Sequence, residues 1–299
     1  MNQSEMTAKI EQGDGFIAAL DQSGGSTPKA LHGYGVEDGA WSSDEEMFDL
    51  IHQMRARIIT SPCFASGKVI GAILFERTMD GMVDGKPTPQ ALIDRGVVPF
   101  VKIDKGLEPE QNGVQMMKPV PDLDALLTRA KGLGVFGTKE RSVINQADEA
   151  GIAVLVAQQF QVARQVLAHG MMPIVEPEVN IKSTDRAESD DLLLAAILEE
   201  LDELAEGQRV MLKLSIPAQS GLFQPLVDHP KVLRVVALSG GFSREDACRE
   251  LAKNPGMIAS FSRALLSDLR AQQSDSEFDA TLGRAIDDIY SASTTKVLA

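Results

Sequence analysis

Eight short apolar runs recur along this chain, and polar residues or a helical pattern follow each of them. Apolar runs of this length are typical of strands that are buried on both faces of a parallel sheet. The alternation of strands and helices predicts an α/β fold, and specifically a (β/α)8 TIM barrel. The alternative interpretation is a doubly wound open sheet. The runs occupy residues 15–21, 69–76, 97–104, 134–141, 171–178, 209–215, 232–239 and 257–263.

Helical periodicity fills the intervals between these runs. Residues 122–133 carry leucines at positions 123, 126, 127 and 133, which is close to the helical period of about 3.6 residues. We expect one domain over residues 1–299, with an extra helical segment at residues 34–57 and a loose tail at residues 293–299. The other helices are expected at residues 157–169, 183–206, 243–253 and 276–291.

The composition narrows the range of partners. The net charge of −14 would repel nucleic acid and anionic membranes, so we expect neither as a partner. No apolar run approaches the ~20 residues of a membrane span, and the N-terminus has no signal-peptide pattern. Cys63 and Cys248 form no CxxC pair and fit a reducing compartment, so we expect a cytoplasmic protein.

Charged side chains gather at the C-terminal ends of the apolar runs, which in a barrel form the active-site face. Side chains two residues apart on a strand point the same way, so Glu176 shares a side with Glu178, and Lys139 with Arg141. Any one of these charges could equally belong to a structural ion pair or to a functional site. Structural ion pairs, however, have no reason to collect at one end of a barrel, so the whole group indicates a functional site. The charged residues are Asp21, Glu76, Lys102, Asp104, Lys139, Arg141, Glu176, Glu178, Lys213 and Arg263.

The lysine of the sixth run, Lys213 in MLKLS, indicates covalent chemistry. A buried lysine costs free energy unless it is paired or neutral, and an amine must be neutral to attack a carbonyl. Desolvation and a neighbouring cation such as Lys139 favour the neutral amine, and a carboxyl group such as Glu176 can shuttle protons beside it. Because the fourth, fifth and sixth strands are neighbours, we expect these three side chains to converge as a Schiff-base site.

Two glycine-containing turns are candidate phosphate sites. The SGG turn after the seventh run offers backbone N–H groups near the start of a helix, and an arginine can add a bidentate donor. A second turn, SGGS, follows the first run. Two anion sites at one mouth would suit a substrate that is phosphorylated at both ends. The candidate contacts are Ser239, Gly240, Gly241 and Arg263 at one site, and Ser23, Ser26 and Lys102 at the other.

With these residues in place, the chain resembles the class I fructose-1,6-bisphosphate aldolases in a short bacterial form. The resemblance covers residues 15–269 and is carried by ALDQSGGS, GAILFERTMDG, VKIDKG, GTKERSV, PIVEPEV, MLKLSIP, LSGGFS and SFSRALL. It implies metal-independent, reversible cleavage of fructose 1,6-bisphosphate to dihydroxyacetone phosphate and glyceraldehyde 3-phosphate, with no cofactor. It also implies a homo-oligomer, since tetramers are common in the family.

The resemblance assigns a role to each candidate residue. Lys213 is similar to the Schiff-base lysine, Glu176 to the acid/base, Glu178 to its supporting carboxylate, and Lys139 to a lysine that positions charge, with Arg141 beside it. Asp21 is similar to the carboxylate near the substrate C4 hydroxyl. The loop contacts divide between the two phosphates: Ser239, Gly240, Gly241 and Arg263 for the ketone half, and Ser23, Ser26 and Lys102 for the other.

Two positions depart from the animal members of the family. Gln22 follows the first-strand aspartate, where animal members have an acidic residue. The chain ends in KVLA, where animal members have a tyrosine that exchanges a proton at the ketone half, and Tyr290 lies in an expected helix.

Three other functions compete with this interpretation of the sequence. A metal-dependent aldolase would use histidine ligands, but none of the four histidines lies at an expected strand end. Another lysine-based phosphosugar aldolase would share Lys213 and need one phosphate site. A silent phosphosugar-binding protein would have no need of Lys213 and Glu176.

Overall fold

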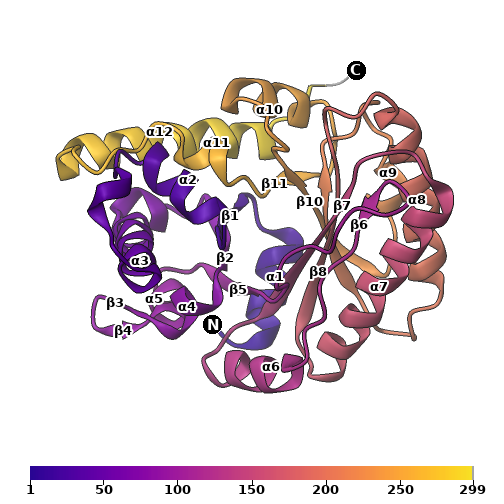
Figure 1. Ribbon diagram of the computed structural model, residues 1–299, viewed down its shortest axis with the longest axis horizontal. Coiled ribbons are helices and arrows are strands. Elements are labelled where there is room, and N and C mark those ends of the chain that lie inside the picture. Colours follow the sequence, from indigo (N-terminus) through magenta and orange to yellow (C-terminus); the bar gives the residue numbers. More distant parts are fainter. Residues whose placement is uncertain (298–299) are drawn as a thin grey trace.

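Eight parallel strands form a nearly closed barrel with helices around it in the computed structural model, which describes residues 1–297 (Figure 1). The ends of the sheet meet where the N–H of Ala19 donates to the carbonyl of Phe261 at 3.2 Å. This closure confirms the predicted barrel and excludes the open sheet. In spatial order the strands are β1 (Phe16–Leu20), β2 (Val69–Leu74), β5 (Val98–Lys102), β7 (Gly137–Ile144), β8 (Met172–Val179), β9 (Val210–Ser215), β10 (Val232–Leu238) and β11 (Ile258–Ala259).

The strand pattern divides the buried side chains into an inner and an outer layer. The inner cluster includes Ile17 of β1, Ile174 of β8 and Met211 of β9, which face the barrel axis at its lower end. Two residues further along β8 and β9, the same faces carry Glu176 and Lys213. The barrel interior is therefore apolar below and charged above.

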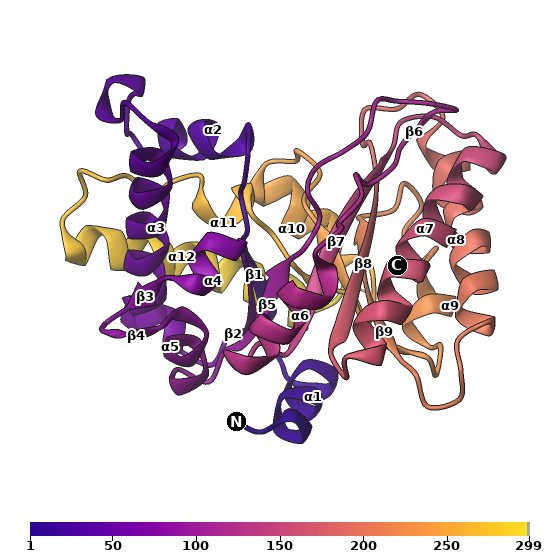
Figure 2. The same ribbon diagram turned by 60° about the horizontal axis from the view of Figure 1, so that its bottom comes forward.

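Helix α1 (Gln3–Gln12) covers the lower end of the barrel, as Figure 2 shows. Met6 and Ile10 of this helix join the inner apolar cluster. The helix begins with a capping box, in which Asn2 accepts from the N–H of Glu5 and the Glu5 side chain accepts from the N–H of Asn2. No element was expected here from the sequence.

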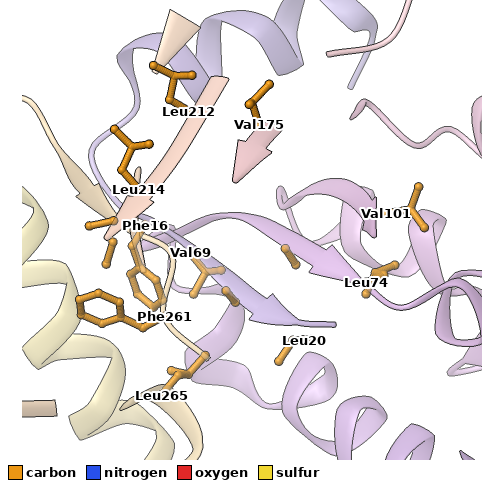
Figure 3. Close-up of a cluster of buried hydrophobic side chains, with 14 of the residues drawn as sticks. Phe16, Leu20, Val69, Leu74, Val101, Val175, Leu212, Leu214, Phe261 and Leu265 are labelled. Atoms are coloured by element: carbon orange, nitrogen blue, oxygen red, sulfur yellow. The ribbon is translucent and has the colours of Figure 1, made fainter. Parts of the chain in front are cut away.

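The outer layer packs the strands against the surrounding helices. Figure 3 shows part of it, where Phe16 of β1 lies beside Phe261 and Leu265. The helices are α2 (Ser26–Gly33), α3 (Asp44–Thr60), α4 (Glu76–Asp80), α5 (Thr88–Asp94), α6 (Leu123–Gly132), α7 (Glu149–Ala168), α8 (Arg186–Asp202), α9 (Gln224–Val227), α10 (Arg244–Ala252), α11 (Arg263–Leu266) and α12 (Asp275–Thr294). Within residues 1–297 none of them has the length and apolar character to cross a membrane.

Two elements differ from their expected bounds for identifiable reasons. β7 runs to Ile144 because β6 (Val114–Gln115) pairs with its end in antiparallel fashion. α7 begins at Glu149, earlier than expected, because the side chain of Asp148 caps it by accepting from the N–H of Gly151 at 2.7 Å.

Residues 293–297 are anchored, in contrast to the loose tail that we expected. The buried hydroxyl of Ser293 accepts from the N–H of Ala259 at 3.0 Å. The Lys296 amine donates to the carbonyls of Met257 and Ala292 at 2.6 and 2.8 Å. These partners are distant in sequence or belong to the preceding helix, so the tail itself carries no local pattern. Residues 298–299 lie outside the described residues.

Candidate active site

Three neighbouring strands bring the predicted Schiff-base residues together. The Nζ of Lys213 lies 2.9 Å from Oε1 of Glu176, and the Nζ of Lys139 lies 2.9 Å from Oε2 of the same carboxylate. Lys213, Glu176 and Lys139 are 4, 4 and 2% exposed. The Glu176 carboxylate therefore bridges two buried amines, and the expected convergence of these side chains is confirmed.

Lys139 is also the centre of a wider ion cluster. Its Nζ lies 2.7 Å from Oδ2 of Asp21 and 3.8 Å from Oδ2 of Asp104. Asp104 is one of the strand-end charges in the sequence, and no role is predicted for it. Its spacing of two residues from Lys102 in VKID placed both side chains on one face, which is the signal that would have linked them.

These contacts set the charges of the cluster. Burial by itself lowers the pKa of Lys139, but Asp21, Glu176 and Asp104 outweigh it and raise that pKa above its ordinary value. Burial raises the pKa values of Asp21 and Glu176, but Lys139 and Lys213 outweigh it and lower both. Lys139 is thus a fixed cation at neutral pH, and the two carboxylates are anions.

The SGG turn, which we predicted as the phosphate site for the ketone half, is a tight turn with two glycines at positive φ. Gly240 and Gly241 take φ values of 57° and 116°, which only glycine adopts without strain, and the N–H of Phe242 donates to the Ser239 carbonyl at 2.9 Å. The Nη2 atom of Arg263 lies 3.5 Å from where a Cβ on Gly241 would be. The structure thus brings the SGG turn and the exposed Arg263 guanidinium together.

At the second candidate site, the polar side chains form hydrogen bonds within the chain. The hydroxyl of Ser26 accepts from the N–H of Ser23 at 2.9 Å and donates to the Ser23 carbonyl at 2.8 Å. The Lys102 amine donates to Oδ1 and the carbonyl of Asp104 at 2.6 and 3.0 Å. Because β2 lies between β1 and β5, Lys102 is not joined to the Ser23–Ser26 turn here.

Comparison with known families identifies the chain. The family model for class-I fructose-bisphosphate aldolase matches residues 3–215, which is more than half of the sequence and contains the Lys139–Glu176–Lys213 cluster. The chain belongs to this family. It is a class I aldolase, a lyase of the Schiff-base type.

Solved structures share the fold of this aldolase. The fructose-bisphosphate aldolase of Plasmodium falciparum, solved with TRAP and a small-molecule inhibitor, has a TM-score of 0.78 and 21% identity over 99% of this chain and 96% of its own. A Corynebacterium glutamicum protein has a TM-score of 0.56 and 13% identity, with coverages of 97 and 92%. A Schiff-base-forming fructose-1,6-bisphosphate aldolase, solved in reaction intermediates, has a TM-score of 0.52 and 13% identity, with coverages of 95 and 100%.

Beside the central cluster of the aldolase, Arg141 and Glu178 form an ion pair between Nε and Oε2. Their strands are in register, with Arg141 next to Glu176 and Val143 next to Glu178. The carboxylate that we expected to support Glu176 is therefore held by a neighbouring arginine.

Sequence reasoning also missed a buried arginine at this mouth. Arg55 of α3 is fully buried and donates to Gln22, directly after Asp21. It follows Ile51 by four residues and precedes Ile58 by three, so it lies on the apolar face of its helix. A charged residue in that stripe was the available signal.

Proposed function

We propose that this class I aldolase cleaves fructose 1,6-bisphosphate reversibly to dihydroxyacetone phosphate and glyceraldehyde 3-phosphate, with Lys213 as the Schiff-base nucleophile. The observation that carries the proposal is the buried Lys213 amine, which shares the Glu176 carboxylate with Lys139 at the charged end of the barrel. The Lys213–Glu176 distance of 2.9 Å is within reach for direct proton transfer.

Each proposed step follows from this arrangement. The Lys213 amine attacks the ketone carbon and gives a carbinolamine, and Glu176 mediates the proton transfers that release its hydroxyl as water, leaving an iminium ion. Removal of the C4 hydroxyl proton by a carboxylate, Glu176 or the nearby Asp21, breaks the C3–C4 bond. C4 leaves as the aldehyde of glyceraldehyde 3-phosphate, and the iminium accepts the electron pair of the broken bond as an enamine. Protonation of the enamine at C3 and hydrolysis return Lys213 and release dihydroxyacetone phosphate.

Lys139 has an electrostatic role in this scheme. As a fixed cation it holds Asp21 and Glu176 ionised, so both carboxylates are available as bases. A preformed charge of this kind needs no reorganisation during the reaction.

A second candidate is an aldolase for a sugar with one phosphate. One observation favours it: the side chains of Ser26 and Lys102 are hydrogen-bonded within the chain, whereas the exposed Arg263 lies beside Gly241 of the SGG turn. Comparing kcat/KM for fructose 1,6-bisphosphate with that for fructose 1-phosphate separates the two, since a substrate preference for two phosphates requires a working second site.

The first test is reduction with borohydride in the presence of dihydroxyacetone phosphate and a chelator, followed by peptide mass mapping. We expect one adduct on Lys213, and none in Lys213→Ala. Lys105→Ala is the matched control, because Lys105 pairs with Glu76 at the surface and should leave trapping unchanged. Trapping that persists in Lys213→Ala, or no adduct in folded wild-type protein, overturns the assignment.

A further inference from the structure

The buried side chain of Arg55 donates hydrogen bonds to the loop that follows β1. Its Nη2 atom donates to the Gln22 carbonyl at 2.5 Å and to Oε1 of Gln22 at 3.2 Å, and its Nη1 atom donates to the Thr78 hydroxyl at 2.7 Å. All three acceptors are neutral oxygens. Arg55 thus fixes both the backbone and the side chain of Gln22.

The other end of the Gln22 amide reaches the neighbouring loop, which follows β11. Its Nε2 donates to the hydroxyl of Ser262 at 2.5 Å and to the Ala19 carbonyl at 3.2 Å. An arginine donor at Oε1 and acceptors at Nε2 determine the orientation of the amide. Gln22 therefore joins two loops that are 240 positions apart in the sequence.

Each of these loops carries one candidate phosphate site. Gln22 lies directly before Ser23, which begins the SGGS turn, and Ser262 lies directly before Arg263, which stands beside Gly241. The chain of contacts from Arg55 through Gln22 to Ser262 is thus a link between the two sites. A change in that link would alter their separation.

The buried charge of Arg55 makes this link costly in desolvation free energy. A fully buried arginine whose hydrogen-bond acceptors are all neutral oxygens is costly, and burial lowers the pKa of Arg55 to about 10 although the nearby charge of Asp21 opposes the effect. If Gln22 moved away, the buried guanidinium of Arg55 would lose two of its three acceptors. This penalty restrains Gln22 strongly.

We propose that Gln22, held by Arg55 and bonded to Ser262, is a positioning residue that sets the separation of the two phosphate sites and so favours a sugar phosphorylated at both ends. The inference rests on the proposed function, since it requires two phosphate sites. It adds a determinant of substrate choice that does not touch the reacting carbons.

The experiment measures kcat/KM for fructose 1,6-bisphosphate and for fructose 1-phosphate in wild type, Gln22→Ala, Ser262→Ala and the double variant. We expect the bisphosphate to monophosphate ratio to fall about tenfold in each single variant, because only a substrate held at both ends depends on the separation. The double variant should fall no further than Gln22→Ala alone, because Gln22→Ala already removes the hydrogen bond to Ser262.

The outcomes are distinguishable. Equal losses for both substrates, an unchanged ratio, or additive effects in the double variant overturn the positioning role. Ser262→Ala removes only a hydroxyl. If Gln22→Ala does not fold, the kcat/KM ratio of Ser262→Ala is the test of the positioning role. If wild type cleaves neither sugar, or borohydride traps nothing on Lys213, the proposed function fails first and the inference fails with it.

Discussion

Two adjacent residues of β7 show how side-chain direction decides the state of a buried charge. Lys139 faces the barrel interior, where carboxylates compensate it. Glu140 faces the other way, and among the described residues neither of its side-chain oxygens has a hydrogen-bond partner. Burial, followed by Asp104, raises the pKa of Glu140 well above 4.5, with Lys139 opposing. The folded protein therefore favours the neutral form of Glu140.

We predict that Glu140→Gln becomes progressively more stabilising as the pH rises. With a folded pKa above its unfolded value, Glu140 contributes stability below the unfolded pKa, and this contribution is lost as the pH rises through the folded pKa. The variant cannot ionise, so the stability gap should widen by up to about 1.4 kcal/mol per pH unit above that unfolded value.

Urea unfolding at pH 5 and pH 8 measures this gap. Glu199→Gln on the exposed face of α8 is the control, and its effect should not depend on pH. A gap of equal size at both pH values would contradict the raised pKa of Glu140.

At the scale of elements, α1 shows that a short helix outside the strand–helix repeat can complete a core. Met6 and Ile10 fill the lower end of the barrel, and Arg209 and Arg234 at that end bind the side chain and the carbonyl of Glu11. The active-site charges lie at the opposite end. Stability and chemistry are thus placed on separate faces.

Ile10→Ala should lower the free energy of unfolding by about 2–5 kcal/mol, because it leaves a cavity in the inner core. Trapping on Lys213 should persist well below the melting temperature. Thermal unfolding beside Ser4→Ala, an exposed residue of the same helix, provides the comparison. Unchanged stability, or loss of trapping from folded protein, would show that α1 does not act as a separate plug.

The molecule as a whole is acidic, with a net charge of −14, yet in its candidate active site the carboxylates are paired with buried lysines. Asp21 and Glu176 have pKa values below their ordinary 3.8 and 4.5 because Lys139 and Lys213 contact or face them. A carboxylate whose pKa is lower in the folded state than in the unfolded state stabilises the fold above its unfolded pKa. This contribution is lost as the pH falls through the folded pKa. The barrel should therefore lose stability below about pH 4.

Asp21→Asn should flatten this loss between pH 4 and pH 2, by roughly 2 kcal/mol for one such carboxylate. Urea midpoints from pH 7 to pH 2 test it. Asp49→Asn, on an exposed position of α3, should follow the wild-type curve. A wild-type slope in Asp21→Asn would mean that its ion pair with Lys139 contributes little.

The sequence by itself determined the eight strands and the central cluster. Burial on both faces leaves a continuous apolar run, and a period of two places Lys139, Glu176 and Lys213 on inner faces of neighbouring strands. Only the tertiary structure decided the α1 plug, the anchored tail, the pairing of Lys102 with Asp104, and the contact of Gln22 with Ser262. These features depend on distances between segments that are remote in the chain or on a choice among acceptors, and neither leaves a local pattern in the sequence.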